Sequence, residues 1–407
     1  MSASAVPSAE NTPRTPVGSV RRRLVFYFSG FDPRGPAHYH SLYGEQSKLH
    51  TPLNGLDLEI GKRRRSGRLA NAWTITSNGG ETVTDYEFLR WDDIIRDRWP
   101  KNEWQLLKSA VPTYWVFFKS NLIGRLLKVA WSSALTVAYP IIAFLGLLLL
   151  GLLLAVGAGF LPWVLGLPWA VGIVPAAAVL VGTIFLGRWL DDRFRSFWLL
   201  RVYGAMQPWA YGKIPALDER IREFAKDMVE KIRASDADEI LLVGHSVGTI
   251  LTVPLVTELL KLEPELGTKG QVFGLVSLGN CLPLVSLLPG SKKLREDLKT
   301  VATAPGVRWL DFSAKRDGAS VTQVDPLKVC GISRPKGIPV RPQQFPVRIV
   351  KMFPPEVYNV VKKDIFRIHF QYIMAGELLT DYDFFAITAG PLSLAERFPE
   401  TTSTSLS

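Results

Sequence analysis

A serine in a glycine-bounded turn is the residue of this chain whose surroundings most clearly suggest chemistry. Residues 239–250 read EILLVGHSVGTI, a short apolar run followed by Gly-His-Ser-Val-Gly and a helix-forming stretch. This order predicts a sharp strand-to-helix turn that holds the Ser246 hydroxyl clear of a sheet edge. Gly244 and Gly248 suit the turn because a side chain there would collide with a neighbouring strand or helix. Ser246 is therefore our candidate nucleophile; the alternative is an ordinary glycine-rich turn with an incidental serine.

A nucleophilic serine needs a base, and the order of residues along the chain leaves one candidate. After a nucleophile turn of this kind, the partners follow as a carboxylate and then a histidine. Of the five histidines, His369 alone lies C-terminal to Ser246. We therefore expect His369 to take the serine proton.

The acid that orients the base should follow a late core strand. Residues 307–313 (VRWLDFS) read as that strand, and residues 314–318 (AKRDG) read as the turn beyond it. Asp317 in this turn is the expected acid. Asp311, inside the strand, and Asp325, before a proline, are the second and third choices.

Two backbone amides are also needed to receive the negative charge that develops during acyl transfer. The residue after the nucleophile, Val247, supplies one. The second should come from a loop after an early strand, and residues 24–28 (LVFYF) are an apolar strand followed by the loop 29–35 (SGFDPRG). Phe31 is the expected second donor, although glycine and proline also mark a simple strand-to-loop exit.

Together, the strand with its SGF loop, the GHSVG turn, the late aspartate and the final histidine resemble the α/β-hydrolase superfamily, in the style of its lipases and esterases. The resemblance covers residues 24 to about 90 and about 217 to 391. It implies an α/β fold with a mostly parallel sheet and flanking helices. It also implies an esterase or lipase triad of Ser246, Asp317 and His369, with Phe31 and Val247 as the oxyanion hole and no cofactor.

A long apolar insert interrupts this pattern before the nucleophile. Between Lys128 and Arg188 the chain has no charged residue and no His, Asn or Gln. The stretch is long enough for two membrane-spanning helices of about 20 residues each. We expect spans at 129–156 and 169–187, joined by a turn at 157–168. A buried helical hairpin and a shallow hairpin that enters and leaves on one side are the alternatives.

The charges that flank the insert predict its orientation. The connecting turn is uncharged, and basic residues lie at both outer ends: Lys119, Arg125, Lys128, Arg188, Arg193 and Arg195. By the positive-inside rule both ends face the cytoplasm. We therefore expect an integral protein of an inner or plasma membrane with its hydrolase domain on the cytoplasmic side. Tryptophans 131 and 189 would lie near one interface, and 163 and 169 near the other.

The composition agrees with a membrane-attached protein. The formal net charge is +11, and much of the excess lies at residues 21–23 and 62–68. Basic clusters beside an anchor would contact anionic lipid head groups; for residues 62–68 a solvated hairpin tip is an equal alternative. Nucleic acid is not an expected partner because no recognisable nucleic-acid module accompanies the charge. The two cysteines, Cys281 and Cys330, need not be paired.

The chain divides into five expected regions: a disordered tail at 1–20, the first part of the hydrolase domain at 21–127, the hairpin at 128–188, the second part at 189–395 and a disordered tail at 396–407. Further expected strands are 82–89, 272–278 and 347–352, with an added hairpin at 56–76 and helices at 104–128 and 218–232. No metal site is expected, because His38 and His40 lack further ligands at a suitable spacing. We expect these two histidines to line an acyl pocket instead.

The expected function is cleavage of a lipid or other hydrophobic acyl ester at a membrane surface. A thioester would need the same residues. The alternative is a membrane-anchored interaction protein on a hydrolase scaffold with an idle triad. The oxyanion loop without the HGGG form, and the lack of strands before residue 24, favour that alternative.

Overall fold

A nine-stranded sheet forms the centre of the described residues, 20–268 and 271–400, of this computed structural model. Its strand order is β2-β4-β5-β1-β6-β7-β8-β9, and β3 pairs with β4. From β5 to β9 every neighbouring pair is parallel, whereas β2, β3 and β5 run antiparallel to β4. The strands are β1 (Arg22–Phe28), β2 (Leu58–Ile60), β3 (Arg64–Ser66), β4 (Ala70–Ser77), β5 (Thr82–Leu89), β6 (Glu239–His245), β7 (Val272–Leu278), β8 (Val307–Ser313) and β9 (Gln343–Pro346). The fold is therefore mixed α/β with a mostly parallel central sheet, as predicted.

The central strands are apolar along their whole length because helices cover both faces of the sheet. Every residue of β6 is buried. The predicted bounds of β5, β7 and β8 agree with the structure, and β1 begins two residues before the predicted strand.

The predicted last strand at 347–352 is wrong. The last strand is β9 (Gln343–Pro346), and Ile349–Met352 forms the 3-10 turn η2. Ile349 and Met352 are buried in this turn. A short apolar run gives the same sequence signal for a buried strand and a buried turn, which explains the error.

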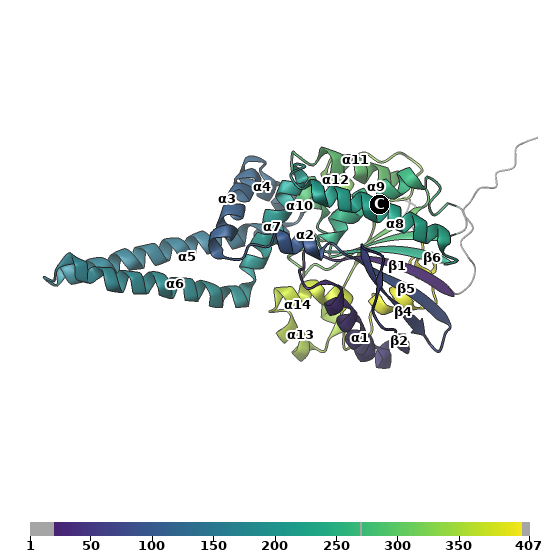
Figure 1. The fold of residues 1–407 in the computed structure, drawn as a ribbon, viewed down its shortest axis with the longest axis horizontal. Coiled ribbons are helices and arrows are strands. Elements are labelled where there is room, and N and C mark those ends of the chain that lie inside the picture. The colour runs from purple at the N-terminus through teal and green to yellow at the C-terminus, as the bar shows by residue number, and fades with distance from the viewer. Residues whose placement is uncertain (1–19, 269–270, 401–407) are drawn as a thin grey trace, which may run out of the picture.

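Two layers of helices enclose the sheet (Figure 1). One face packs against α8 (Pro215–Ala234), α9 (Gly248–Leu262), α10 (Leu282–Ser286), α11 (Lys292–Thr303) and α12 (Pro326–Val329). The other face packs against α1 (Gly35–Asn54), α13 (Pro355–Val361), α14 (Ile365–Phe370), η3 (Gln371–Ile373), α15 (Phe384–Ala389) and α16 (Leu394–Arg397). Alternate residues of β1 point into the two cores, with Phe26 on the first face and Tyr27 on the second.

The apolar insert forms two long helices that project from the body as a hairpin (Figure 1). They are α5 (Trp131–Val164) and α6 (Ile173–Phe194), joined through the 3-10 turn η1 (Trp169–Gly172). Both are long and apolar enough to cross a membrane, and 11% of the most apolar window of each is buried. The first helix continues to Val164, beyond the predicted end at residue 156. The observed turn is therefore shorter than the predicted one.

The first residues of α5 belong to the body rather than to the projecting hairpin. Ser133, Val137 and Pro140 are buried, and Ser133 donates a hydrogen bond to the Ser320 carbonyl over 2.7 Å. From Ile142 onward most large side chains are exposed. The exposed part of α5 therefore begins at Ile142, 13 residues after the start of the predicted span at residue 129.

Shorter helices surround the base of the hairpin (Figure 1). They are α2 (Asp92–Asp97), α3 (Glu103–Lys119), α4 (Leu122–Val129) and α7 (Ser196–Ala210). The single helix predicted at 104–128 is two helices, because Asn121 adopts a left-handed conformation with φ 51° between α3 and α4. The hairpin predicted at 56–76 is the three strands β2, β3 and β4.

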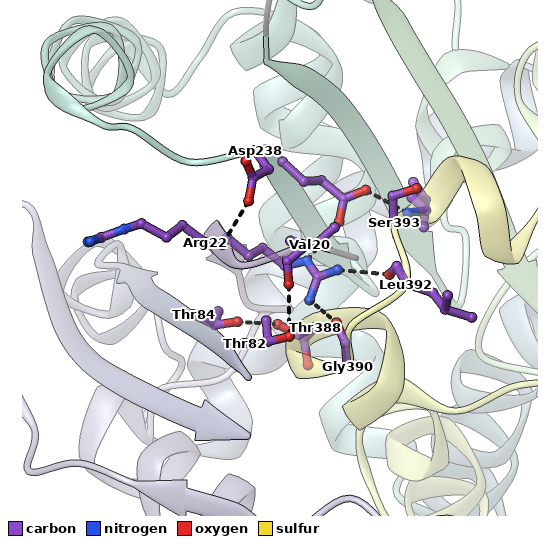
Figure 2. Close-up of polar contacts among 12 residues, drawn as sticks. Val20, Arg22, Thr82, Thr84, Asp238, Thr388, Gly390, Leu392 and Ser393 are labelled. Carbon is purple, nitrogen blue, oxygen red and sulfur yellow. Dashed lines mark hydrogen bonds and ion pairs between the residues drawn. The ribbon is translucent and has the colours of Figure 1, made fainter. Parts of the chain in front are cut away.

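Hydrogen bonds connect the N-terminal end of β1 to the C-terminal segment (Figure 2). The Val20 carbonyl accepts a hydrogen bond from Thr82, and its amide donates one to the Pro391 carbonyl. Arg23 is buried, pairs with Glu239 over 2.7 Å, and donates to two C-terminal carbonyls. Arg23 therefore does not form part of a lipid-contacting basic cluster, contrary to the sequence-based expectation.

The C-terminal tail predicted from residue 396 is folded as far as residue 400. Ser393 and Glu396 form a capping box at the start of α16, and Phe398 is buried against the sheet. Residues 401–407 and 1–19, where the remainder of the two tails was expected, lie outside the described residues.

Candidate active site

Ser246 lies in the turn between β6 and α9 with a strained backbone. Its φ angle is +57°, in the left-handed region that a non-glycine residue enters at a cost. A Cβ atom at Gly248 would lie 2.2 Å from the Phe28 carbonyl oxygen, and one at Gly244 would lie 2.9 Å from the Gly248 carbonyl oxygen. The two glycines thus allow the start of α9 to lie closely against β1 and β6, as the sequence predicts.

His369 and Asp317 form a buried pair at the carboxyl end of the sheet. The Nδ1 atom of His369 lies 2.9 and 3.0 Å from the two carboxylate oxygens of Asp317. This contact fixes the proton on Nδ1, so Nε2 carries the lone pair that a base needs. The Nε2 atom is buried and has no hydrogen-bond partner among the described residues.

The Asp317 carboxylate is held by further donors. The Tyr372 hydroxyl lies 3.0 Å from one oxygen, and the Ala319 amide lies 3.1 Å from the other. Burial alone would raise the pKa of Asp317, but the charge of His369 and hydrogen bonds with His369, Ser320 and Tyr372 lower it below its ordinary value. Asp317 is therefore held as a carboxylate that orients and stabilises the imidazole.

The other two carboxylates considered from the sequence have different contacts. Asp311 is buried and accepts a hydrogen bond from Asn280 over 2.9 Å. Burial raises its pKa to about 7. Asp325 caps helix α12 and forms an ion pair with Arg334. Of the three, Asp317 is the one that contacts His369.

Ser246 does not form the expected hydrogen bond with His369, because Nε2 is without a partner. Burial raises the pKa of the nearby Cys281 thiol, and the Ser246 side chain lowers it in part. Ser246 and His369 nevertheless line the same two cavities. Rotation about the serine χ1 bond redirects the hydroxyl, and catalytic hydrogen bonds are often loose before substrate binds.

The expected oxyanion donors lie next to the serine. A Cβ atom at Gly30 would lie 2.9 Å from the Ser246 Cβ atom, so the loop after β1 packs directly on the nucleophile turn. Phe31 is buried, and its ring stacks on Trp99 at 5.6 Å between centroids. Within residues 20–268 and 271–400, neither the Phe31 nor the Val247 amide donates a hydrogen bond. Both amides are therefore free to receive a ligand oxygen.

A narrow apolar cavity of about 20 Å³ extends from Ser246 and His369 beneath the helices at the base of the hairpin. Its walls come from α3, α4, the buried start of α5, α7, α9 and α10. The apolar side chains that line it are Phe117, Leu122, Val137, Trp198, Leu199, Val202, Tyr203, Met206, Val247, Ile250, Cys281, Leu284, Val285, Leu288 and Ala319. This lining suits a hydrocarbon group.

An open cavity of about 310 Å³ lies on the other side of the two residues. It is bounded by the Gly30–Arg34 loop, α14, the end of α6 and the start of α7. Five charged side chains line it: Asp32, Arg34, Asp191, Arg195 and Arg201. Trp198 lines both cavities, and its ring lies 5.6 Å from the His369 ring. The candidate nucleophile and base therefore stand between an apolar cavity and a charged one.

Several residues near the site differ from the expectations or were missed. His38 and His40 line neither cavity, and His40 contacts the Gly61 carbonyl over 2.9 Å, so the predicted role in an acyl pocket is wrong. His245 contacts the His369 carbonyl, and burial lowers its pKa to about 3, so it is neutral. Trp198 and Arg201 were missed because α7 follows the apolar insert and carries no motif.

No group of three or more His, Cys, Asp or Glu side chains that could hold a metal ion occurs among the residues that the structure describes. A search of family models, curated proteins and solved structures found no match to this chain. The chemistry of the site must therefore be argued from its own geometry. A strained serine, a histidine oriented by a carboxylate and two unbonded amides are the parts required for acyl transfer through a covalent intermediate.

Proposed function

We propose that this protein is a membrane-anchored serine hydrolase that cleaves an ester of a hydrophobic acyl group. The observation that carries the proposal is the convergence of Ser246, in its left-handed turn, with the His369–Asp317 pair at the same cavities. A strained serine at a strand-to-helix turn is the form a nucleophile takes in such enzymes.

The topology of the sheet supports the proposal. Candidate residues follow the carboxyl ends of β1, β6 and β8, and His369 follows β9 on α14. The carboxyl ends of parallel strands meet at one edge of a sheet, where α/β proteins bind their ligands. The order of nucleophile, acid and histidine along the chain is the order of the α/β hydrolases.

In the proposed mechanism, His369 Nε2 takes the Ser246 proton as the serine oxygen attacks the ester carbonyl. The Phe31 and Val247 amides receive the negative charge of the tetrahedral intermediate. His369 then protonates the leaving alcohol, and a water activated by the same histidine releases the acid. Asp317 keeps the imidazole in the required tautomer throughout.

The lining of the site favours a hydrophobic acyl group. The apolar side chains begin at Ser246 and continue beneath helices that lead into the hairpin. An acyl chain is larger than the cavity of about 20 Å³, so it would have to displace these side chains to enter. A thioester would fit the same residues, because the leaving atom does not change what the serine, histidine and amides must do.

The hairpin is proposed to cross the bilayer with both ends on the cytoplasmic side. The exposed part of α5 from Ile142 to Val164 is about 35 Å long, and η1 with α6 as far as Gly187 is about 28 Å long, at 1.5 Å per residue. A bilayer core of about 30 Å matches these lengths. The basic residues at the outer ends favour this orientation.

Helix α3 offers a second surface for the membrane at the base of the hairpin. Trp104, Trp115 and Phe118 are 63%, 56% and 76% exposed, and they recur at helical spacing on one side. Lys108 and Lys119 lie over the Trp104 and Trp115 rings. Exposed tryptophans beside lysines are typical of a helix in the interfacial region.

Cysteine accessibility tests the membrane geometry. A cysteine placed at Leu165, near the tip of the hairpin, should react only with reagent added on the far side of sealed vesicles. Reaction from the same side as the termini would contradict a spanning hairpin, and protection from both sides would indicate a shallow or buried one. Neither result bears on the hydrolase chemistry.

The hydrolase proposal is tested by turnover of a p-nitrophenyl ester in detergent. Ser246→Ala and His369→Ala should each lower kcat by several orders of magnitude, and the double variant should be no worse than either, because the two residues act as one unit. His38→Ala, outside both cavities, is the matched control and should retain activity. Additive losses, or full activity of Ser246→Ala, would refute the proposal.

The competing function is a membrane-anchored interaction protein with an idle triad. The lack of a hydrogen bond between Ser246 and His369 Nε2 favours it. Wild-type protein that neither turns over esters nor reacts with a fluorophosphonate would support this alternative.

A further inference from the structure

We infer that the alcohol part of the ester substrate carries an anionic phosphate group, which the open cavity binds through Arg201. The inference rests on the proposed function and names the substrate class of the same site. It predicts a lysophosphatidate-like acyl ester rather than a neutral glyceride.

The two cavities that meet at Ser246 would hold different parts of the substrate. The narrow cavity is apolar, and the open cavity of about 310 Å³ carries the charged side chains. An attack on the carbonyl with the acyl chain in the apolar cavity leaves the alcohol side in the open one. This open space has room for a small head group.

The charges of the open cavity are not balanced. Arg34 is neutralised by Asp32, which it contacts through Nε and a terminal nitrogen at 2.6 to 2.9 Å. Asp191 accepts a hydrogen bond from the Phe197 amide and attracts Arg201 only through space. Among the described residues that line the cavity, three arginines therefore face two aspartates.

Neither Arg195 nor Arg201 forms an ion pair among the described residues, and Arg201 is attracted through space by Asp191 and Glu103. The Arg201 guanidinium lies over the Trp99 ring at 4.9 Å, and its Nε atom is buried with no hydrogen-bond partner among the described residues. Burial lowers the pKa of Arg201, although arginine remains charged. A half-buried guanidinium with unused donors can bind a planar or tetrahedral oxyanion through two hydrogen bonds.

The position of the cavity explains how such a group would reach it. Asp191 and Arg195 belong to the end of α6 and the residue that follows it, and both line the cavity. The apolar part of α6 ends at Gly187, so in the proposed membrane geometry these residues lie just beyond the hydrocarbon. Lipid phosphates lie at this depth. A lipid source is therefore favoured over free phosphate.

The test compares an anionic with a neutral ester of the same acyl chain. Kinetic constants would be measured for 1-oleoyl lysophosphatidate and 1-monooleoylglycerol, each as a minor component of the same nonionic micelles. Because hydrogen bonds to a charged group are worth about 10- to 100-fold in binding, Arg201→Gln should lower kcat/KM for the phosphate ester by about that factor. The neutral ester should change less than about threefold.

Two further variants distinguish a specific contact from general charge. Arg201→Lys keeps the charge and should recover part of the preference for the phosphate ester. Arg222→Gln removes an exposed arginine of α8 outside both cavities and should leave the preference unchanged. Equal loss for both esters in Arg201→Gln, or the same loss in Arg222→Gln, would overturn the inference.

Inhibition of the wild-type protein gives a test that does not depend on folding of a variant. Glycerol 3-phosphate should slow p-nitrophenyl ester hydrolysis at a concentration at least about tenfold lower than glycerol, since only the phosphate can use Arg201. Equal potency of glycerol and glycerol 3-phosphate would overturn the inference. If inorganic phosphate matched glycerol 3-phosphate and the anionic ester had no advantage, the cavity would be a free-phosphate site instead.

The two levels of the proposal fail differently. If the wild-type protein hydrolysed no ester and its Ser246 did not react with a fluorophosphonate, the proposed function would be wrong. Normal hydrolysis of the p-nitrophenyl ester with no dependence on phosphate or Arg201 would remove only the substrate class.

Discussion

Substitution of Gly30 by alanine should damage the reaction while leaving the fold intact. The added Cβ atom would lie 2.9 Å from the Ser246 Cβ atom, 3.3 Å from its Oγ atom and 3.4 Å from the His245 carbonyl oxygen. Carbon atoms in contact normally lie about 3.5–4.0 Å apart. The loop after β1 and the nucleophile turn must therefore separate by about 0.6–1.1 Å.

This displacement separates the serine from the Phe31 amide, the expected oxyanion donor that follows Gly30. A misplacement of about 1 Å costs about 100-fold in rate, or about 2.7 kcal/mol of transition-state stabilisation. We expect kcat/KM of Gly30→Ala for a p-nitrophenyl ester to fall by about that factor. The cost of overpacking to stability is about 1–3 kcal/mol, which leaves most of the protein folded.

The measurement is steady-state hydrolysis together with the rate of fluorophosphonate labelling, because both need the serine and its oxyanion donors. Gly44→Ala on α1 is the matched control, since its Cβ atom would meet only Ile60 at 4.0 Å. If Gly30→Ala retained kcat/KM within about threefold of wild type, the loop after β1 would not serve the reaction, and the assignment of Phe31 would be refuted.

Three further predictions concern the acid, a buried carboxyl group and the membrane surface. Asp317→Asn should lower kcat by about 10²–10⁴-fold with little change in KM, because His369 loses its orienting carboxylate; unchanged kcat would contradict the triad. Asp311→Asn should stabilise the protein as pH rises. The folded pKa of Asp311, about 7, exceeds the unfolded value of about 3.9. The free energy of unfolding of the wild type therefore falls by up to about 4 kcal/mol between about pH 4 and 7, and that of the variant does not. Urea unfolding at pH 4 and 8 checks this, and a pH-independent difference would contradict it. Trp115→Ala should weaken binding of the protein to anionic vesicles without altering p-nitrophenyl ester turnover in detergent, whereas unchanged vesicle binding would remove α3 from the interface.

Much of the site could be predicted because its parts follow strong local signals. The apolar run before Ser246, followed at once by a glycine-bounded turn, is typical of a buried strand of a covered sheet, and the glycines of the turn indicate close packing. The order of residues along the chain left His369 as the one candidate for the base. The contact between His369 and Asp317 then follows from the geometry of parallel strands, whose carboxyl ends meet at one edge.

The remaining features depend on tertiary contacts that have no local signal. The composition of α5 does not show that its first residues lie inside the body. Ser133, Val137 and Pro140 are uncharged, like the exposed residues that follow them. Arg23 looked like part of a basic surface cluster, yet it is buried by Glu239 and two C-terminal carbonyls. The α7 residues that divide and line the cavities, Trp198 and Arg201, belong to no motif.

The central claim is that Ser246 is the nucleophile, and the most direct measurement is the site of a covalent adduct. Wild-type protein in detergent would be treated with a fluorophosphonate, digested, and mapped by peptide mass spectrometry. We predict one adduct, on Ser246, that is absent from Ser246→Ala and strongly slowed in His369→Ala. An adduct on another serine, or equal labelling of wild type and Ser246→Ala, would contradict the account.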